Sequence, residues 1–511
     1  MLLTWTLPLV ESLCGRQPRK KVSSHLWMAT TNTSETISGR QPCGVGHALL
    51  VMEAVVLGWL IISEGPAGAL WLVFAGIAVI ALGILVSLRW PLGAISTLVL
   101  ASAMPRLAGS IFGLHVRPEH VAVAYVLLIV LFRIITGRAR SPVGLLDYVL
   151  VAYVSLNFLT SAFSSPEPRM TLRWAALNAI VIGSYFLMRL LVTNLHALHS
   201  AFKVLLGVGA FESAYGILCF FSNRAFGTQF GIAADQYGVI PGTHGTQYEA
   251  NLFGSYSACC AIMFFALYLL DEGSRRNVRS LLGFGLCTAG ALVSLSRAAL
   301  AALLVIGVLV FLVGTTKRQL GLRRLIAVAS SFALLLLLIT PFIGSFLQER
   351  FSTIELESPS ADSSTWIRMV SLGAALDDIQ AHPVFGSGTD SFQLTFNWRD
   401  YIGPTEMDDY AGWISNTPVR VLHDTGIVGL GIFLAFLITL GVQTVRGVRG
   451  AAGYTRVVII ALAAGLVVYT ITFQTTEATL LAFPWVHIGL LAAAVNMIPS
   501  RDALAPNGSA I

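Results

Sequence analysis

Long apolar segments recur along this chain and constrain its fold more than any other feature. A helix needs about 20 consecutive apolar residues to cross about 30 Å of hydrocarbon, and runs of that kind alternate with short polar turns from residue 46 onward. Only 11% of the 511 residues are charged, whereas soluble domains carry about 25%. The sequence therefore predicts an all-α, polytopic integral membrane protein.

The apolar runs predict about 12 to 14 transmembrane helices, given the length that one crossing needs. The short run at 92–104 is the one that could instead be re-entrant. The expected spans are 46–63, 67–88, 92–104, 118–136, 145–163, 171–192, 200–221, 248–270, 280–294, 298–315, 325–347, 419–442, 456–475 and 479–498.

Basic residues cluster on one side of this arrangement. An excess of Lys and Arg in short loops marks the cytoplasmic face. With one crossing per expected span, this rule places both termini inside and residues 348–418 outside, and it explains the net charge of +6 without nucleic acid as a partner. The clusters are Arg16/Arg19/Lys20/Lys21, Arg138/Arg140, Arg275/Arg276/Arg279, Lys317/Arg318/Arg323/Arg324 and Arg446/Arg449/Arg456.

The same pattern divides the chain into five parts. The apolar start, residues 1–10, precedes the first basic cluster, the reverse of the order in a signal peptide. A disordered cytosolic tail and a true start at Met28 both remain open. The expected parts are a cytoplasmic N-terminal tail (1–45), a first transmembrane bundle (46–347), a large extracytoplasmic loop (348–418), C-terminal transmembrane helices (419–498) and a cytoplasmic tail (499–511).

The large loop contains one expected helix. Apolar residues repeat at helical spacing between Trp366 and Ile379. The segment His382-Pro-Val-Phe-Gly-Ser-Gly388 would end this helix with a proline and two glycines. Such a helix suits a lid or a pocket wall, although a purely structural loop has the same pattern.

No motif indicates a metal or another cofactor. The six cysteines form no CxxC spacing, and none lies in the large loop. Glu406, Asp408 and Asp409 offer oxygen ligands for a divalent ion, but acidic residues in a wet loop are generally only solvated.

Four short strings stand at the predicted outer ends of the spans and in the loop. They are Gly242-Thr-His-Gly-Thr-Gln-Tyr-Glu-Ala-Asn-Leu-Phe-Gly254, Ser294-Leu-Ser-Arg-Ala-Ala-Leu300, the run from Arg368 through Gly388, and Ser415-Asn-Thr-Pro-Val-Arg-Val-Leu-His-Asp-Thr-Gly-Ile-Val-Gly429. In this order around one long loop they resemble the O-antigen ligase and O-antigen polymerase superfamily of bacterial membrane glycosyltransferases, over roughly residues 60–500.

The resemblance implies a specific reaction. Such enzymes take a glycan from an undecaprenyl diphosphate carrier at the outer face of the inner membrane. They pass it to a sugar hydroxyl of a glycan or lipid-linked acceptor, on lipid A-core in ligases and on another carrier-linked repeat in polymerases. They work without metal or nucleotide, so the expected partners are the carrier-linked donor, the acceptor and membrane lipid.

The resemblance also implies roles for individual residues. Arg297 corresponds to the family's Ser-Arg arginine, and an arginine at the edge of a bilayer indicates a function. Its planar guanidinium suits diphosphate oxygens, and Arg368 and Arg420 are expected to assist it. The remaining glycan-binding candidates are Glu249, Asn251 and Asn416.

The general base is the position where this chain departs from the family. The family's His-Asn pair falls on Ser415-Asn416, so the ligase-type histidine is missing, which favours polymerase-like activity. A base near neutral pH is most often histidine. His423 could serve where its span is partly unwound, and the carboxylate of Asp408 is the other candidate. His244, His382 and Asp409 are also expected at the outer face.

Two other functions remain open. A flippase or transporter of lipid-linked glycans would need charged groups at mid-membrane, and Glu212 is such a group. A protein O-oligosaccharyltransferase would use the same donor chemistry.

Overall fold

The computed structural model describes residues 91–107, 109–111, 114–137, 143–232, 242–271, 274–316, 363–397, 400 and 412–498. The chain divides into two compact units, Met1–Thr97 and Leu98–Ile511. Of the first unit, residues 91–97 are described, and they form the beginning of helix α4 (Pro91–Ser102).

The described residues of the second unit are mostly helical. Its one described sheet is a short antiparallel hairpin in which Gly109 pairs with Val116 and Ile111 with Leu114. The elements are β1 (Gly109–Ile111), β2 (Leu114–Val116), α5 (Pro118–Ile135), α6 (Leu145–Phe163), α7 (Pro168–Leu191), α8 (Leu195–Phe226), α9 (Ala250–Leu270), α10 (Ser274–Val293), α11 (Arg297–Thr316), α13 (Ser363–Ala381), α14 (Phe392–Thr395), α16 (Thr417–Gly450), α17 (Gly453–Thr472) and α18 (Ala482–Asn496).

The helices confirm the prediction of an all-α polytopic membrane protein. Among the described residues, seven helices are long and apolar enough to cross a membrane, and four further apolar helices are shorter. These helices coincide with the expected spans from 92–104 to 479–498, apart from 325–347. That segment, the spans 46–63 and 67–88 and both predicted tails lie outside the described residues, so the total of 12 to 14 stays a prediction.

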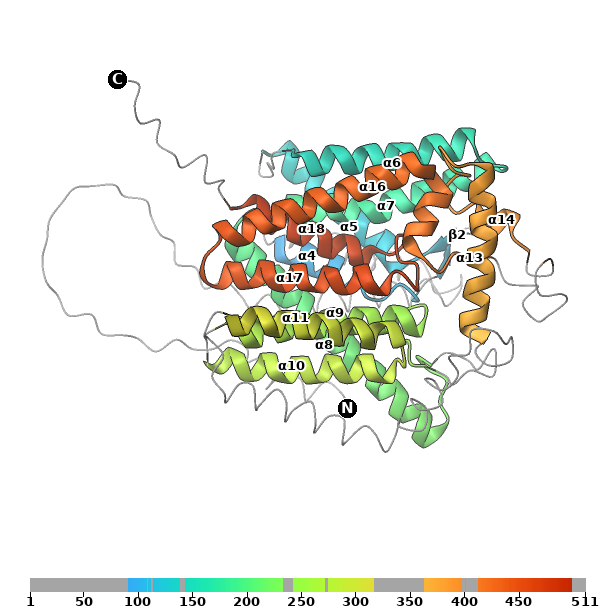
Figure 1. Ribbon diagram of the computed structural model, residues 1–511. Helices are drawn as coiled ribbons and strands as arrows, with labels where there is room; N and C mark the ends of the chain where they lie inside the picture. Colours follow the sequence, from blue (N-terminus) through green and yellow to red (C-terminus); the bar gives the residue numbers. More distant parts are fainter. Residues whose placement is uncertain are drawn as a thin grey trace, which may run out of the picture. The chain divides into compact units, whose positions relative to one another are not determined.

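Helix α9 forms the centre of the bundle. It is apolar on every side, and 94% of the 18-residue stretch with the highest mean hydropathy is buried. It packs against α8, α10, α11 and α17, which surround it in Figure 1. Small residues permit the close approach: a Cβ on Gly254 would lie 2.5 Å from the Ser294 Oγ, and such contacts are how membrane helices pack tightly.

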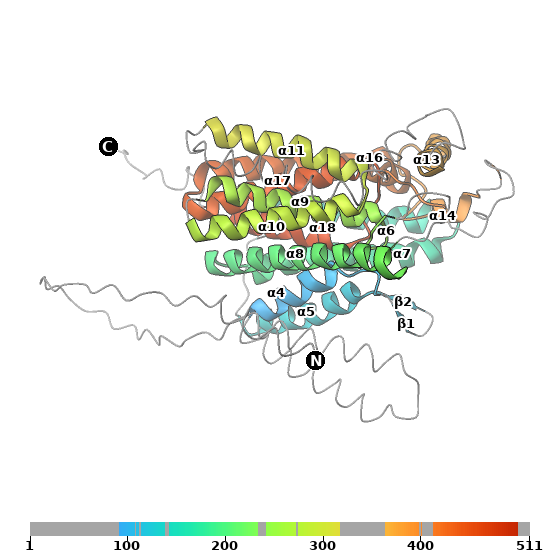
Figure 2. The same cartoon turned by 90° about the horizontal axis from the view of Figure 1, so that it is seen from below.

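Helix α13 lies crosswise at one end of the bundle. Figure 1 shows it running across the bundle helices, and Figure 2 shows it end-on at the same end. It packs against α16, where Ala374 and Ala375 form a buried cluster with Phe392 and Ile414. The helix expected between Trp366 and Ile379 is therefore present, and it covers the end at which α9, α11 and α16 begin and α10 and α17 end.

Candidate functional site

The turn between α10 and α11 places Arg297 at the end of the bundle. The Ser294 Oγ donates to the carbonyl oxygen of Ala291 at 2.7 Å. The Ser296 Oγ accepts from the N–H of Ala299 at 3.4 Å, as the side chain of a helix N-cap does. The two serines thus end one helix and begin the next, and Arg297 follows as the first residue of α11.

The segment before α9 is packed against this turn. The N–H of Thr243 donates to the carbonyl oxygen of Val293 at 3.2 Å. A Cβ on Gly242 would lie 2.7 Å from the carbonyl oxygen of Ser294. Two of the four strings singled out in the sequence are therefore in direct contact, and the first turn of α9, with Asn251, stands beside Arg297.

Helix α16 is interrupted near its beginning. Gly426 has φ 65° and ψ −170°, a conformation that interrupts the helix and is open essentially only to glycine. Residues 383–388 bind at the break through their main chain. The N–H groups of Ser387 and Gly388 donate to the carbonyl oxygens of His423 and Asp424 at 2.9 and 3.0 Å.

Residues 383–388 also accept a hydrogen bond from the residue that follows Gly426. The N–H of Ile427 donates to the carbonyl oxygen of Pro383 at 2.9 Å. Backbone groups left unpaired by an interrupted membrane helix need such partners. A Cβ on Gly426 would lie 2.2 Å from the carbonyl oxygen of Val384, so this close approach requires glycine for steric as well as conformational reasons.

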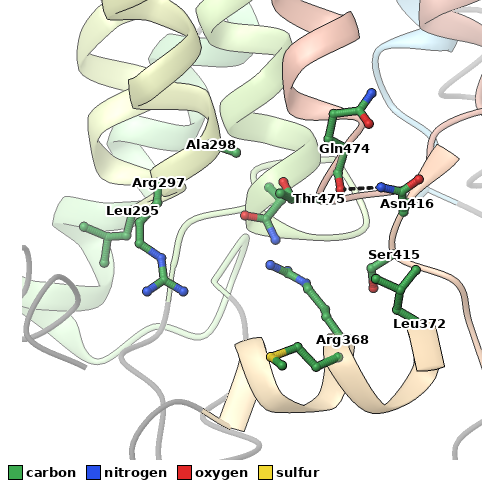
Figure 3. Close-up of a pocket in the computed structure, with 11 residues that line it drawn as sticks. Leu295, Arg297, Ala298, Arg368, Leu372, Ser415, Asn416, Gln474 and Thr475 are labelled. Carbon is green, nitrogen blue, oxygen red and sulfur yellow. Dashed lines mark hydrogen bonds between the residues drawn. The ribbon is translucent and has the colours of Figure 1, made fainter. Parts of the chain in front are cut away.

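A pocket of about 250 Å³ lies between α13 and the end of the bundle. It draws residues from all four strings and from the loop after α17. Figure 3 shows the side chains of Arg297 and Arg368 reaching into it from α11 and from α13. The lining residues are Asn251, Leu295, Arg297, Ala298, Arg368, Met369, Leu372, Ser415, Asn416, Gln474 and Thr475.

The charged side chains among the described lining residues are all positive. Among the described residues that line it, two are arginines, none is acidic, and five carry neutral polar side chains. The amide of Asn416 also supports the wall, because its Nδ2 donates to the carbonyl oxygen of Gln474 at 2.9 Å. Arginine pairs with phosphate through two parallel hydrogen bonds, so the pocket suits a phosphorylated ligand.

A second cluster of charged residues surrounds Arg420. Its guanidinium contacts Asp390 at 2.5 Å, Glu477 at 2.8 Å and Asp424 at 3.6 Å. The Arg420 side chain is 8% exposed. Three carboxylates from three separate segments thus bind one arginine and hold the 383–390 segment, α16 and the loop after α17 together. We call Arg420, Asp390, Asp424 and Glu477 the Arg420 cluster.

His423 extends the Arg420 cluster toward α13. Its Nδ1 lies 3.0 Å from Asp424 and its Nε2 lies 2.8 Å from Asp378. The imidazole is fully buried, and both of its nitrogens are used by carboxylates. The expected unwinding is present three residues further on, at Gly426, yet His423 links α13 to α16 instead of lining the pocket.

Asp378 and His244 are among the titratable side chains outside the membrane-spanning helices whose pKa values are shifted. The hydrogen bond from His423 holds the pKa of Asp378 below its usual value. Burial and the neighbouring Arg106 lower the pKa of His244 to about 4. The Arg106 guanidinium is within hydrogen-bond distance of the His244 Nε2. His244 is therefore neutral at physiological pH and held in place, 3% exposed.

The structure brings together most of the residues predicted for the site. Asn251, Arg297, Arg368 and Asn416 line one pocket, and Ser415, which the resemblance aligns with a histidine, lines it as well. Glu249 stands two residues before Asn251. Arg420 and His423 belong to the Arg420 cluster and its extension, while Asp408 and Asp409 lie outside the described residues.

Sequence reasoning missed three residues, Gln474, Thr475 and Glu477. They lie in the short loop between α17 and α18, where a polar run, Gln-Thr-Thr-Glu, interrupts two apolar segments at the predicted outer face. That run was the available signal. Among the described residues, no group of three or more His, Cys, Asp or Glu could hold a metal ion. Metal independence of the reaction stays a prediction.

Comparison with known proteins gives one family. Residues 282–434 match the model of the family described as O-antigen ligase, which confirms the resemblance. The match includes three of the four strings, and the string at 242–254 lies before it. The match covers less than half of the chain and includes Arg297, Arg368 and Ser415. A search of curated proteins finds no match. The family and the apolar helices together indicate a multi-pass protein of the bacterial inner membrane.

Proposed function

Since residues 282–434 are similar to O-antigen ligases, we propose that this protein transfers a glycan from undecaprenyl diphosphate to a sugar hydroxyl. Glycan transfer of the O-antigen ligase type is the general activity that the family match supports. The carrier, the acceptor and the residues that bind them are the part that we add.

One observation carries the proposal. Arg297 and Arg368 come from segments about 70 residues apart in the sequence, yet both reach into one pocket whose described lining contains no carboxylate. Two guanidinium groups at one pocket attract a diphosphate, and they stabilise the negative charge that develops on it as it leaves. The apolar lining residues Leu295, Met369 and Leu372 suit the first part of a lipid chain.

The position of the pocket agrees with a donor that is presented at the outer face. The pocket lies where α10 ends and α16 begins. The basic residues Arg279 and Arg446 lie toward the opposite ends of these two helices, and basic loops mark the cytoplasmic side. This charge distribution supports an extracytoplasmic active face.

Reconstitution tests the proposal directly. The purified full-length protein in proteoliposomes, supplied with undecaprenyl-diphosphate-linked glycan, should release undecaprenyl diphosphate and form a longer or transferred glycan, with or without EDTA. Movement of intact donor between leaflets without cleavage would instead indicate a flippase. Transfer to protein hydroxyls alone would indicate an oligosaccharyltransferase.

A further inference from the structure

The proposed reaction needs a proton acceptor that the pocket does not contain. When a sugar hydroxyl attacks the anomeric carbon, its proton has to leave, and a positioned carboxylate or imidazole is the usual acceptor. None of the described residues that line the pocket carries such a group. Among the described residues, the candidates for the base therefore stand beside the pocket and not in its lining.

Most nearby carboxylates already bind cations. Asp390, Asp424 and Glu477 contact the Arg420 guanidinium. On α13, Asp378 binds His423. Protonating one of them would weaken an ion pair that joins parts of the fold.

Glu249 differs from these residues. It is the N-cap residue of α9 and is half-buried, two positions before Asn251. Its Oε1 accepts a hydrogen bond from the hydroxyl of Thr476, whose neighbour Thr475 lines the pocket. Within the described part of the chain, no ion pair joins Glu249 to a cation. A carboxylate accepts several hydrogen bonds, so Glu249 can accept one from a substrate as well.

The loop that carries Glu249 is held in place by hydrogen bonds to Glu212 and Ala103. The Glu212 Oε1 accepts from the N–H of Thr246 at 2.8 Å. The Thr246 hydroxyl and the Gln247 amide both donate to the carbonyl oxygen of Ala103, at 3.0 and 2.8 Å. The intramembrane acid Glu212 thus anchors the loop. A catalytic group held in this way needs little reorganisation during the reaction.

We propose that Glu249 is the general base of the transfer, an inference that rests on the proposed function. The acceptor hydroxyl oxygen forms a bond to the anomeric carbon of the donor while the bond from that carbon to the diphosphate oxygen breaks. The bonding electrons leave with undecaprenyl diphosphate, which Arg297 and Arg368 stabilise. The hydroxyl proton passes to the Glu249 carboxylate and then to water.

Glu249→Gln tests this assignment because it keeps the shape and the acceptor oxygen for Thr476 but cannot take the proton. Removing a general base lowers turnover by about 100-fold or more, and donor binding should remain within about 3-fold of the wild-type value. Glu249→Asp should restore part of the rate. The matched control is Asp377→Asn, which removes the same charge from an exposed position on α13 and should leave turnover unchanged.

The pH profile adds a second readout that does not depend on how well the variant folds. Wild-type turnover should fall on acidification as the base becomes protonated, and the residual activity of Glu249→Gln should lack this acid limb. Glu249→Gln turnover within 3-fold of wild type, or an unchanged acid limb, would overturn the assignment of Glu249. Failure of the wild-type protein to cleave carrier-linked glycan would overturn the proposed function itself.

Discussion

The pocket and the Arg420 cluster use the same residue type in opposite electrostatic settings. In the pocket, Arg297 and Arg368 stand among neutral polar and apolar residues. Near the beginning of α16, Arg420 is bound by three carboxylates. The described lining of the pocket contains no carboxylate, whereas the second arrangement uses the charge of an arginine to join parts of the fold. Among the described residues, the two places thus differ in the acids around the arginine and not in the arginine itself.

Replacing Arg420 should have the largest effect. Arg420→Met leaves Asp390, Asp424 and Glu477 without their shared cation, and breaking a buried ion pair in this way costs about 3–5 kcal/mol. The thermal midpoint in detergent and the yield of monodisperse protein should both fall. A normally stable Arg420→Met protein that binds donor poorly would instead assign Arg420 to the substrate.

Replacing Arg297 should lower activity without lowering stability. Arg297→Ala removes a donor that stabilises the departing diphosphate, which is worth about 10²–10³-fold in turnover. Arg297→Lys should recover only part of the loss, because an ammonium lacks the planar fork. Turnover by proteoliposomes and the thermal midpoint are the two measurements. Wild-type turnover in Arg297→Ala would remove the pocket from the mechanism.

Gly426→Ala should have a smaller effect, on the joint between residues 383–388 and α16. Its backbone conformation costs a non-glycine residue about 1–3 kcal/mol, and the added methyl would collide with the carbonyl oxygen of Val384. Thermal unfolding measures the loss. Gly431→Ala, on the same helix with open space around it, is the control. Equal stabilities of the two variants would show that the break is not required.

The link between Asp378 and His423 should have the smallest effect, about 1 kcal/mol. Because the pKa of Asp378 is lowered in the folded protein, its contribution is present above the ordinary carboxyl pKa and is lost as the pH falls through the lowered value. Asp378→Asn should therefore be less stable than wild type at pH 7, and the difference should shrink below about pH 4. Thermal midpoints between pH 3 and 7 check this, and a constant difference would contradict it.

The sequence predicted the helices well because each apolar run had to find a hydrocarbon or protein environment. It also predicted α13, since the spacing of apolar residues between Trp366 and Ile379 is helical. It placed Asn251, Arg297, Arg368 and Asn416 in one site, and the structure has them in one pocket. These four residues carry local motifs that do not depend on distant contacts.

The carboxylates around Arg420 could not be predicted from the sequence. Asp390 and Glu477 are 30 and 57 residues away in the sequence, and nothing local indicates that both reach one guanidinium. Gln474 and Thr475 were missed for a related reason, because neutral polar residues in a short loop have no pattern of their own. Sequence motifs identify chemical groups, but the folded chain decides which charges are balanced.

The seam between residues 383–388 and the broken α16 is formed by N–H and carbonyl groups, while the side chains of Val384 and Phe385 are 48% and 53% exposed. The attachment of residues 383–388 to α16 is therefore insensitive to the side chains of Val384 and Phe385. Substitutions at these two positions can accumulate without detaching the segment, so its surface is free to diverge among descendants while the joint is inherited intact.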